Sequence, residues 1–183
     1  MGKVLVFIFS LFFAGSAMAE NWKVIPQESK IEFKATQNHS PVTGGFPKFD
    51  AEINFSPEDL AGSNVKITVD LNEITASYDE ASKTLKTADW FAVDVFPKAV
   101  FEAGSFTKTA TNEYEAVGDL TIRDKKVPVK LKFTLDDYSA KAATAKGSTM
   151  LSRNAFGIGQ GDWQKTDVVK DEVEVTFTIK ATK

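Results

Sequence analysis

Residues able to carry out acid–base or nucleophilic chemistry are few in this sequence of 183 residues. His39 is the one histidine, and cysteine is absent, which removes thiol nucleophiles, disulfides and cysteine-ligated metals. A serine nucleophile needs a neighbouring base, yet no G-x-S-x-G elbow accompanies His39. No H-E-x-x-H pattern is present to hold zinc, and residues 157–161 lack both a dinucleotide fingerprint and the lysine of a P-loop. Few options for catalysis remain, and we expect no metal site and no cofactor.

The aromatic residues are more informative, because several fall outside the alternating segments that the chain otherwise shows. Loops and short helices seldom need many large apolar groups unless these groups line or close a cavity. An apolar pocket with few polar groups is typical of a small-molecule site. The alternative is that these aromatics cap an ordinary filled core. They are Phe46, Trp90, Phe91, Phe96, Phe156 and Trp163.

Alternating apolar and polar residues recur along the chain and predict β-strands that each bury one face. The clearest case runs from Val127 to Leu135, where every second residue is apolar. Neighbouring strands are close in sequence, which favours antiparallel hairpins. Eight or nine strands are expected, over residues 22–25, 31–35, 49–55, 65–71, 100–107, 114–122, 127–135, 141–150 and 173–179.

Two stretches break the alternation and predict short helices. Ser56 and Pro57 are typical of a helix start, so a helix is expected over residues 57–60. Residues 79–91 are rich in Ala, Lys, Glu and Leu and predict one or two further helices. No linker or repeat divides the chain, which indicates a single domain. Its sheet can remove its edges by closing into a barrel, but a β-sandwich with a filled core shows the same alternation.

The first 19 residues have the form of a secretory signal peptide. Lys3 precedes an apolar run over residues 4–14, and Ala17-Met18-Ala19 provides the exit site. The run is shorter than the ~20 residues that span a bilayer. We expect cleavage before Glu20, so that residues 20–183 form the exported domain. The net charge of −3 argues against a nucleic-acid partner.

Three stretches of the sequence carry a recognisable order and spacing. They are TADWF at 87–91 with FPKAVF at 96–101, GDLTIR at 118–123 with VPV at 127–129, and SRNAFGIG at 152–159. An N-terminal pattern contains Ile31, Phe33, Phe46 and Phe49. Together these stretches resemble the YceI-like family of exported bacterial proteins.

This resemblance implies an all-β, lipocalin-like antiparallel barrel of about eight strands with short helices, closed around an apolar tunnel. It also implies a periplasmic protein that binds polyisoprenoid or related lipids and has no catalytic residues. Many members carry Arg-Asp-x-His-Leu at the start of the central helix, whereas this chain has Tyr78-Asp79-Glu80-Ala81-Ser82. Any head-group contact made by that motif is therefore not carried over.

The leading hypothesis is a periplasmic carrier or store of a polyisoprenoid, quinone or related lipid. One alternative is a hydrolase or isomerase of small lipids that uses His39, and another is a filled-core module that contacts an envelope membrane partner. Arg153 is a candidate for the tunnel mouth together with His39, and equally a structural residue that satisfies loop carbonyls. The oligomeric state is left open, a homodimer included. The expected ligand-binding residues are Ile31, Phe33, His39, Phe46, Phe49, Trp90, Phe91, Phe96, Arg153, Phe156 and Trp163.

Overall fold

The computed structural model describes residues 21–183, so the expected signal peptide lies outside the described residues. The fold is built almost entirely of β-strands, as the alternation predicts. The strands are β1 (Asn21–Val24), β2 (Lys30–Gln37), β3 (Ser40–Gly45), β4 (Phe49–Asn54), β5 (Asn64–Asp70), β6 (Thr75–Ala76), β7 (Lys98–Ala110), β8 (Glu113–Ile122), β9 (Lys125–Asp136), β10 (Ala142–Ser152) and β11 (Glu172–Thr182).

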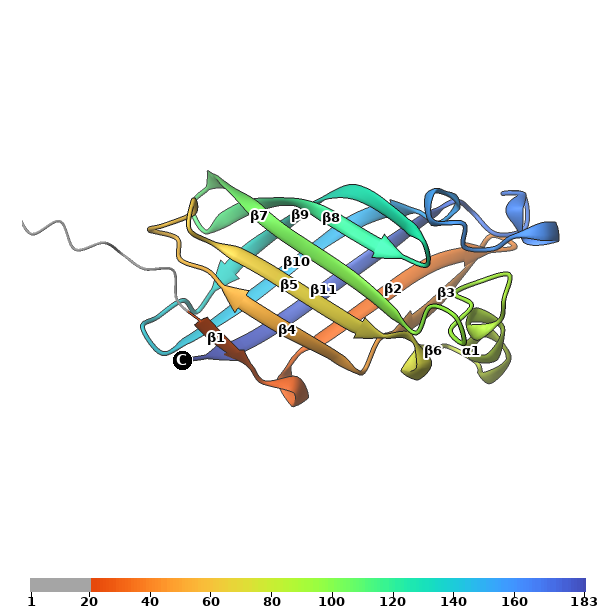
Figure 1. The fold of residues 1–183 in the computed structure, drawn as a ribbon, viewed down its shortest axis with the longest axis horizontal. Helices are drawn as coiled ribbons and strands as arrows, with labels where there is room; N and C mark the ends of the chain where they lie inside the picture. The colour runs from red at the N-terminus through yellow and green to blue at the C-terminus, as the bar shows by residue number, and fades with distance from the viewer. Residues whose placement is uncertain (1–20) are drawn as a thin grey trace, which may run out of the picture.

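These strands form one sheet that closes on itself (Figure 1). Its hydrogen-bonded order is β1-β4-β5-β7-β8-β9-β10-β11-β2-β3-β6, and β1 also pairs with β11. β1 and β2 both pair with β11, at successive positions along it, so together they form one path of the barrel. In the next path, β4 pairs with β1 and β3 pairs with β2. In the third, β5 pairs with β4 and β6 pairs with β3. The 11 strands therefore make eight antiparallel paths of a closed barrel, and the sandwich alternative is excluded.

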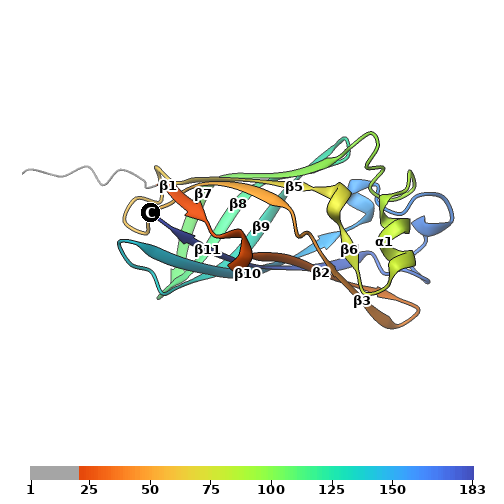
Figure 2. The ribbon, with the colours of Figure 1, turned by 90° about the horizontal axis from the view of Figure 1, so that it is seen from below.

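Three neighbouring paths are interrupted at the same level of the barrel. The first break contains the 3-10 helix η1 (Pro26–Glu28), the second contains Pro47, and the third contains η2 (Leu71–Glu73). Proline has no N–H to donate to a sheet, so the ladder stops at the first two breaks. The Asp70 N–H donates to the Lys48 carbonyl at 2.9 Å and holds the paths together there. Figure 2 shows the chain bending at η1 between β1 and β2.

The two ends of the barrel have different connections (Figures 1 and 2). At the end that holds β1 and the C-terminus, the strands are joined by short loops and turns. At the opposite end, α1 (Asp79–Lys86) and residues 87–97 join β6 to β7. Residues 153–171, with η3 (Asn154–Phe156) and η4 (Gly161–Gln164), join β10 to β11 there. We call α1, residues 87–97 and residues 153–171 together the cap.

Three sequence expectations need correction or refinement. The predicted helix over residues 57–60 is wrong: this segment is a pair of turns, with the Asp59 N–H donating to the Ser56 carbonyl at 3.1 Å. The Ser56 hydroxyl still accepts from the Glu58 N–H at 3.3 Å, so a helix-capping contact forms, but the chain must turn back at once into β5. The helix expected over 79–91 ends at Lys86, and turns follow. β3 and β6 were not predicted, because proline and two glycines hide the alternation in β3 and β6 has two residues.

In the part of the chain that the structure describes, no helix is both long and apolar enough to cross a membrane.

Candidate ligand-binding cavity

A cavity of about 280 Å³ lies inside the barrel and is lined by side chains from nearly every strand. This volume is near the lower limit of ~300–1,000 Å³ for small-molecule pockets. The lining follows the two-residue period of the strands, since successive side chains of a strand point to opposite faces. In β9, for example, Val129, Leu131, Phe133 and Leu135 all line the cavity. The apolar residues of the alternating segments therefore form the cavity wall.

The lining is almost wholly apolar. Among its 38 residues, all within the described part of the chain, the side chains of Thr149 and Arg153 are polar or charged. Tyr138, Trp22 and Trp90 each add a single polar atom to an aromatic ring. Such a wall favours the hydrocarbon part of a ligand and gives little stabilisation to a charge inside the barrel.

Interlocked aromatic rings fill the end of the barrel that holds β1. The Phe55 ring lies 5.3 Å from the Phe106 ring, 5.6 Å from the Tyr114 ring and 5.9 Å from the Phe133 ring. The Trp22 indole Nε1–H donates to the Phe55 carbonyl at 2.9 Å, which fixes this group to the wall. We call this the aromatic end. Its edge-to-face contacts are the arrangement that aromatic quadrupoles favour.

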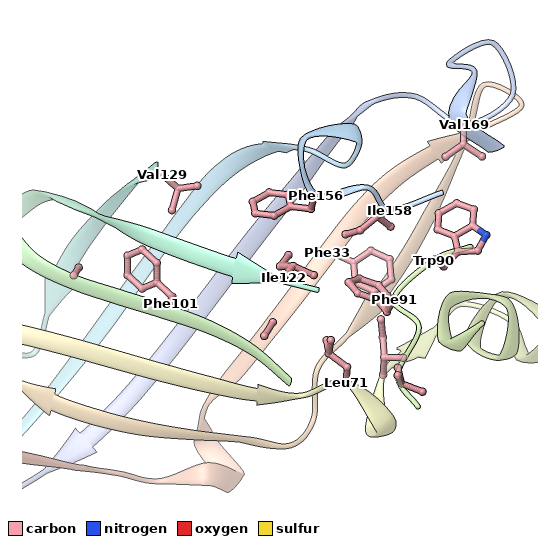
Figure 3. Packing of buried hydrophobic residues seen from close by; sticks show 14 of the residues in the cluster. Phe33, Leu71, Trp90, Phe91, Phe101, Ile122, Val129, Phe156, Ile158 and Val169 are labelled. Atoms are coloured by element: carbon pink, nitrogen blue, oxygen red, sulfur yellow. The ribbon is translucent and has the colours of Figure 1, made fainter. Parts of the chain in front are cut away.

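At the cap end, side chains from the strands meet side chains from the long connections (Figure 3). The Phe46 ring lies 5.6 Å from the Phe33 ring of β2 and 6.4 Å from the Phe91 ring of the cap. Phe156 of η3 and Leu71 of η2 are among the most deeply buried side chains described, at 2% and 0% exposure. The cap therefore contributes its own apolar groups to the cavity wall.

Trp90 occupies the outer limit of this cap region. Its side chain lines the cavity and is 8% exposed. The Trp163 ring packs against it at 5.5 Å, and the Arg153 guanidinium lies 5.9 Å from the Trp90 ring centre. Trp163 itself is half-buried and does not line the cavity. Of these two tryptophans, Trp90 is the one in contact with the cavity, and Trp163 forms a layer behind it.

Arg153 holds the cap loop together. Its Nε donates to the Lys170 carbonyl at 3.0 Å, and Nη2 donates to the carbonyls of Val169 at 2.8 Å and Lys165 at 3.1 Å. Nη1 donates to the Ile158 carbonyl at 2.9 Å and makes further bonds to Gly159 and to the neighbouring Asn154 side chain. A guanidinium has five N–H groups, so this network engages the whole fork. The side chain is a structural organiser of residues 153–171.

Arg153 is a buried cation, and among the described residues no direct salt bridge balances its charge. Burial lowers the pKa of Arg153 below its usual value, and the nearby charge of Asp171 acts in the opposite direction. Gly159 lets the guanidinium approach, because its φ is +79° and a Cβ there would lie 2.4 Å from Arg153 Nη1. The glycine-rich stretch at 157–161 is therefore a tight loop wrapped around an arginine.

Arg123 is the second of only two arginines in the sequence, and it too supports the cap. It sits in the β8–β9 turn, where its Nη1 donates to the carbonyls of Ala88 at 3.0 Å, Gly157 at 3.2 Å and Trp90. These bonds connect both cap segments to the barrel. Guanidinium–carbonyl bonds from both arginines thus help to hold the cap, and sequence reasoning did not predict this role for Arg123.

The structure brings together seven of the eleven expected ligand-binding residues. His39, by contrast, is exposed at the tip of the β2–β3 hairpin and does not line the cavity. Asn38 and His39 form the two-residue turn with φ of 48° and 64°, a left-handed geometry in which Asn and His are both enriched. Phe49 and Phe96 are half-buried outside the lining, as is Trp163. The seven in the lining are Ile31, Phe33, Phe46, Trp90, Phe91, Arg153 and Phe156.

Most of the wall lies on strand residues that sequence reasoning had assigned to a core face and not to a site. Their signal was present as period-2 alternation, but alternation does not say whether the buried face surrounds a solid core or a cavity. The whole aromatic end was also missed as part of the site. The wall residues concerned are Phe55, just after β4, and strand residues that include Phe101, Phe106, Leu120, Phe133, Leu135, Val173, Val175, Phe177 and Ile179.

Acid–base and metal-binding groups do not gather at the cavity. Within residues 21–183, no group of three or more His, Asp and Glu side chains is placed to hold a metal ion. Acidic groups pair with lysines on the outside of the barrel, as in Lys66–Glu102 at 3.1 Å and Lys126–Asp119 at 3.0 Å. The chemistry of the cavity is therefore that of an apolar container.

A closed antiparallel barrel of eight paths around an apolar cavity defines the structural class. The family model for the YceI-like domain matches residues 22–181, which is nearly the whole described chain. The chain therefore belongs to the YceI-like domain family.

Similarities to individual proteins and solved structures are consistent with this assignment. The chain is 27% identical to protein YceI of Escherichia coli, over 96% of this chain and 92% of that protein. The crystal structure of BcnA from Burkholderia cenocepacia matches with a TM-score of 0.83 and 29% identity, covering 87% of this chain and 100% of BcnA. A polyisoprenoid-binding domain from Saccharophagus degradans matches with a TM-score of 0.70, covering 90% of this chain and 98% of that domain. At 13% identity, the last comparison shows the shared fold alone.

Proposed function

We propose that this protein binds a long apolar amphiphile, a polyisoprenoid or quinone, inside the barrel and carries or stores it in the periplasm. The observation that carries the proposal is the apolar cavity, which is lined from Trp22 near one end to Trp90 at the other. A filled-core interaction module would not contain such a cavity. The structural likeness to a polyisoprenoid-binding domain supports the same class of ligand.

The energetics suit a ligand with a long hydrocarbon tail. Each CH₂ group removed from water contributes ~0.8 kcal/mol, so a tail of a few isoprene units gains several kcal/mol without any polar contact. Rings such as Phe33, Phe101 and Phe133 provide contact area along the path. Selectivity for tail length then follows from the distance between the cap and the aromatic end.

Lipid extraction tests the proposal directly. Protein purified from its native host without detergent is extracted with organic solvent, and the extract is analysed by mass spectrometry. We expect an isoprenoid or quinone in proportion to the protein. A cavity-wall variant, Phe91→Asp, places a carboxylate in an apolar site and should retain much less lipid. Val117→Asp is the matched control, because Val117 is 37% exposed, whereas Phe91 is 7% exposed.

The outcomes of this experiment are distinct. Absence of lipid from the parent protein, or equal lipid in the Phe91→Asp and Val117→Asp variants when both fold, contradicts the proposal. Thermal unfolding measured beside extraction identifies a variant that merely fails to fold. Fluorescence of Trp90 provides a second readout, because a lipid tail that replaces water beside the indole changes its emission.

The periplasmic location rests on the N-terminal sequence. Lys3, the apolar run over residues 4–14 and Ala17-Met18-Ala19 are the parts of a cleavable signal peptide. The mature protein should begin at Glu20 and be recovered from the periplasm. N-terminal sequencing that still finds the apolar run would contradict this proposal.

We also propose that binding is not coupled to catalysis. His39, the candidate base, is exposed at a hairpin tip outside the cavity lining. His39→Ala should therefore leave lipid retention unchanged. Loss of a lipid-converting activity in that variant would favour the enzyme alternative.

A further inference from the structure

The indole nitrogen of Trp90 is a buried donor without an acceptor. Within the part of the chain that the structure describes, Trp90 Nε1 is one of two buried side-chain polar atoms that have no hydrogen-bond partner. The side chain is 8% exposed and lines the cavity. Figure 3 shows the nitrogen on the edge of the ring that faces away from Ile122 and Phe156, towards the outer cap. The donor thus lies at the cap limit of an otherwise apolar wall.

Trp22 provides the contrast at the other end of the barrel. It too lines the cavity and is 6% exposed, but its Nε1–H donates to the Phe55 carbonyl at 2.9 Å. Buried indole N–H groups normally find such a partner, since an unsatisfied buried donor is costly. Phenylalanine would fill the Trp90 site without that cost. The nitrogen at Trp90 therefore calls for an acceptor that the protein itself does not provide.

The charge of that acceptor is limited by the apolar wall around the indole. Arg153 lies over the Trp90 ring, but its N–H groups all donate to main-chain and Asn154 oxygens. Arg123 approaches the Trp90 carbonyl, and its Nη1 donates to loop carbonyls. An anionic head group beside the indole would lose hydration against a wall that is almost wholly apolar, whereas a ketone, ether or hydroxyl oxygen needs only the indole donor.

We propose that Trp90 Nε1–H is the polar anchor of the ligand site, donating to an uncharged acceptor oxygen on the head group of the bound amphiphile. The ligand then lies with its head at the cap and its tail directed to the aromatic end. This inference rests on the proposed lipid-binding function and adds the orientation and the head-group class.

The three tryptophans of the chain make the anchor directly observable. In protein labelled with nitrogen-15, each indole N–H gives one signal, assigned with the variants Trp22→Phe, Trp90→Phe and Trp163→Phe. The full mature protein, stripped of lipid, is titrated with three probes that share one tail: a tetraprenyl quinone, the tetraprenyl hydrocarbon and tetraprenyl phosphate. We expect the quinone to move the Trp90 signal downfield, as a new hydrogen bond does. The hydrocarbon should not produce this downfield shift, and the Trp22 signal should not show it with any probe.

Affinities of the variants complete the test. Trp90→Phe keeps an aromatic ring and removes the donor, so its affinity for the quinone should fall about five- to tenfold while its affinity for the hydrocarbon changes by less than about twofold. Trp163→Phe is the matched control in the same cap and should affect both ligands alike. The phosphate should bind at least about tenfold more weakly than the quinone.

Each outcome has a definite meaning. Equal shifts of the Trp90 signal with quinone and hydrocarbon, equal losses for both ligands in Trp90→Phe, or preference for the phosphate overturns the inference while leaving lipid binding intact. Failure of all three probes to bind overturns the proposed function as well. Unfolding temperatures measured for every variant show whether an affinity loss reflects a damaged fold.

Discussion

At the aromatic end, the barrel is closed mainly by side chains of its own strands and the loops next to them, whereas at the cap end it is closed by long connections between strands. Phe55, Phe106, Tyr114 and Phe133 contact one another through rings. The cap adds guanidinium–carbonyl bonds made by Arg123 and Arg153 to its own apolar packing and main-chain bonds. One end is held by ring contacts spread over the strands, whereas polar bonds concentrated on two arginine side chains are specific to the other.

Given the proposed lipid binding, this difference predicts which end admits the ligand. Ring packing at the aromatic end is part of the barrel's cooperative core, so it can be lost only when the strands separate. A connection that lies outside the sheet can open while the sheet stays intact, as lids over binding sites do. We therefore expect the ligand to pass through the cap end and the aromatic end to act as the closed bottom of the tunnel.

The largest effect is expected at the aromatic end. Phe55→Ala removes a ring that touches three others, and large-to-small core changes of this kind cost about 3–5 kcal/mol in the free energy of unfolding. Urea unfolding should show this loss as a single cooperative transition. Val117→Ala, at an exposed position of β8, should change stability by less than about 0.5 kcal/mol. A loss below 1 kcal/mol for Phe55→Ala would mean that the aromatic end is not part of the cooperative core.

A smaller and more local effect is expected for Arg153→Met. The change keeps apolar bulk but leaves several carbonyls without donors, of which the buried ones at Ile158 and Val169 cannot readily turn to water. We expect a loss of about 2–4 kcal/mol. Hydrogen exchange should rise first in residues 153–171, with β8 and β9 still protected. Uniform acceleration across the barrel would contradict the separation of the two ends.

Two neighbouring glycines sharpen the role of Arg153. Gly159→Ala places a Cβ 2.4 Å from Arg153 Nη1 at a φ of +79°, whereas Gly161→Ala has a φ of +61° and meets no atom within 4 Å. Both variants carry the left-handed strain of about 1 kcal/mol. Only Gly159→Ala should add a further cost of about 1–2 kcal/mol by displacing the guanidinium. Equal unfolding temperatures for the two variants would show that the contact does not matter.

The smallest effect concerns pH at the break between β5 and η2. The hydrogen bonds of Asp70 to Lys48 and Asn72 lower the pKa of this carboxyl from 3.8 to about 2. Because the folded pKa lies below the unfolded one, the contribution is complete above about pH 4 and is lost as the pH falls through about 2. Asp70→Asn should therefore unfold at a slightly lower temperature than the parent at pH 7, and this difference should shrink at pH 2. A difference that is independent of pH would contradict this assignment.

Sequence patterns predicted the barrel wall better than its connections. The sequence located nine of the strands, six of them by clear alternation, because a strand that buries one face must repeat every second residue. The same logic failed at residues 57–60, where helix-start residues serve a turn instead. It also failed at β3, where Pro41, Gly44 and Gly45 break the pattern. Gly44 is required there by its neighbours, since a Cβ would lie 2.1 Å from the Thr75 carbonyl oxygen.

The candidate site was located only in part. Trp90, Phe91 and Phe156 were identified because large aromatics in loops are unusual, and the structure places all three in the lining. His39 was a candidate because of its chemistry, and its position at a hairpin tip is set by pairing between β2 and β3. Arg153 had two interpretations, which could be separated only by seeing where its five donors are directed.

The amino-acid sequence by itself determined that the chain forms antiparallel strands, that each strand buries one face, and that few groups are available for catalysis. These properties follow from local periodicity and residue type, which can be determined for each segment of the sequence separately. Only the tertiary structure decided that the buried faces surround a cavity instead of a solid core, because closure depends on β1 meeting β11 from the far end of the chain. It likewise decided that Trp22 Nε1 has an acceptor and Trp90 Nε1 has none, since a hydrogen bond is a matter of where residues distant in sequence come to lie.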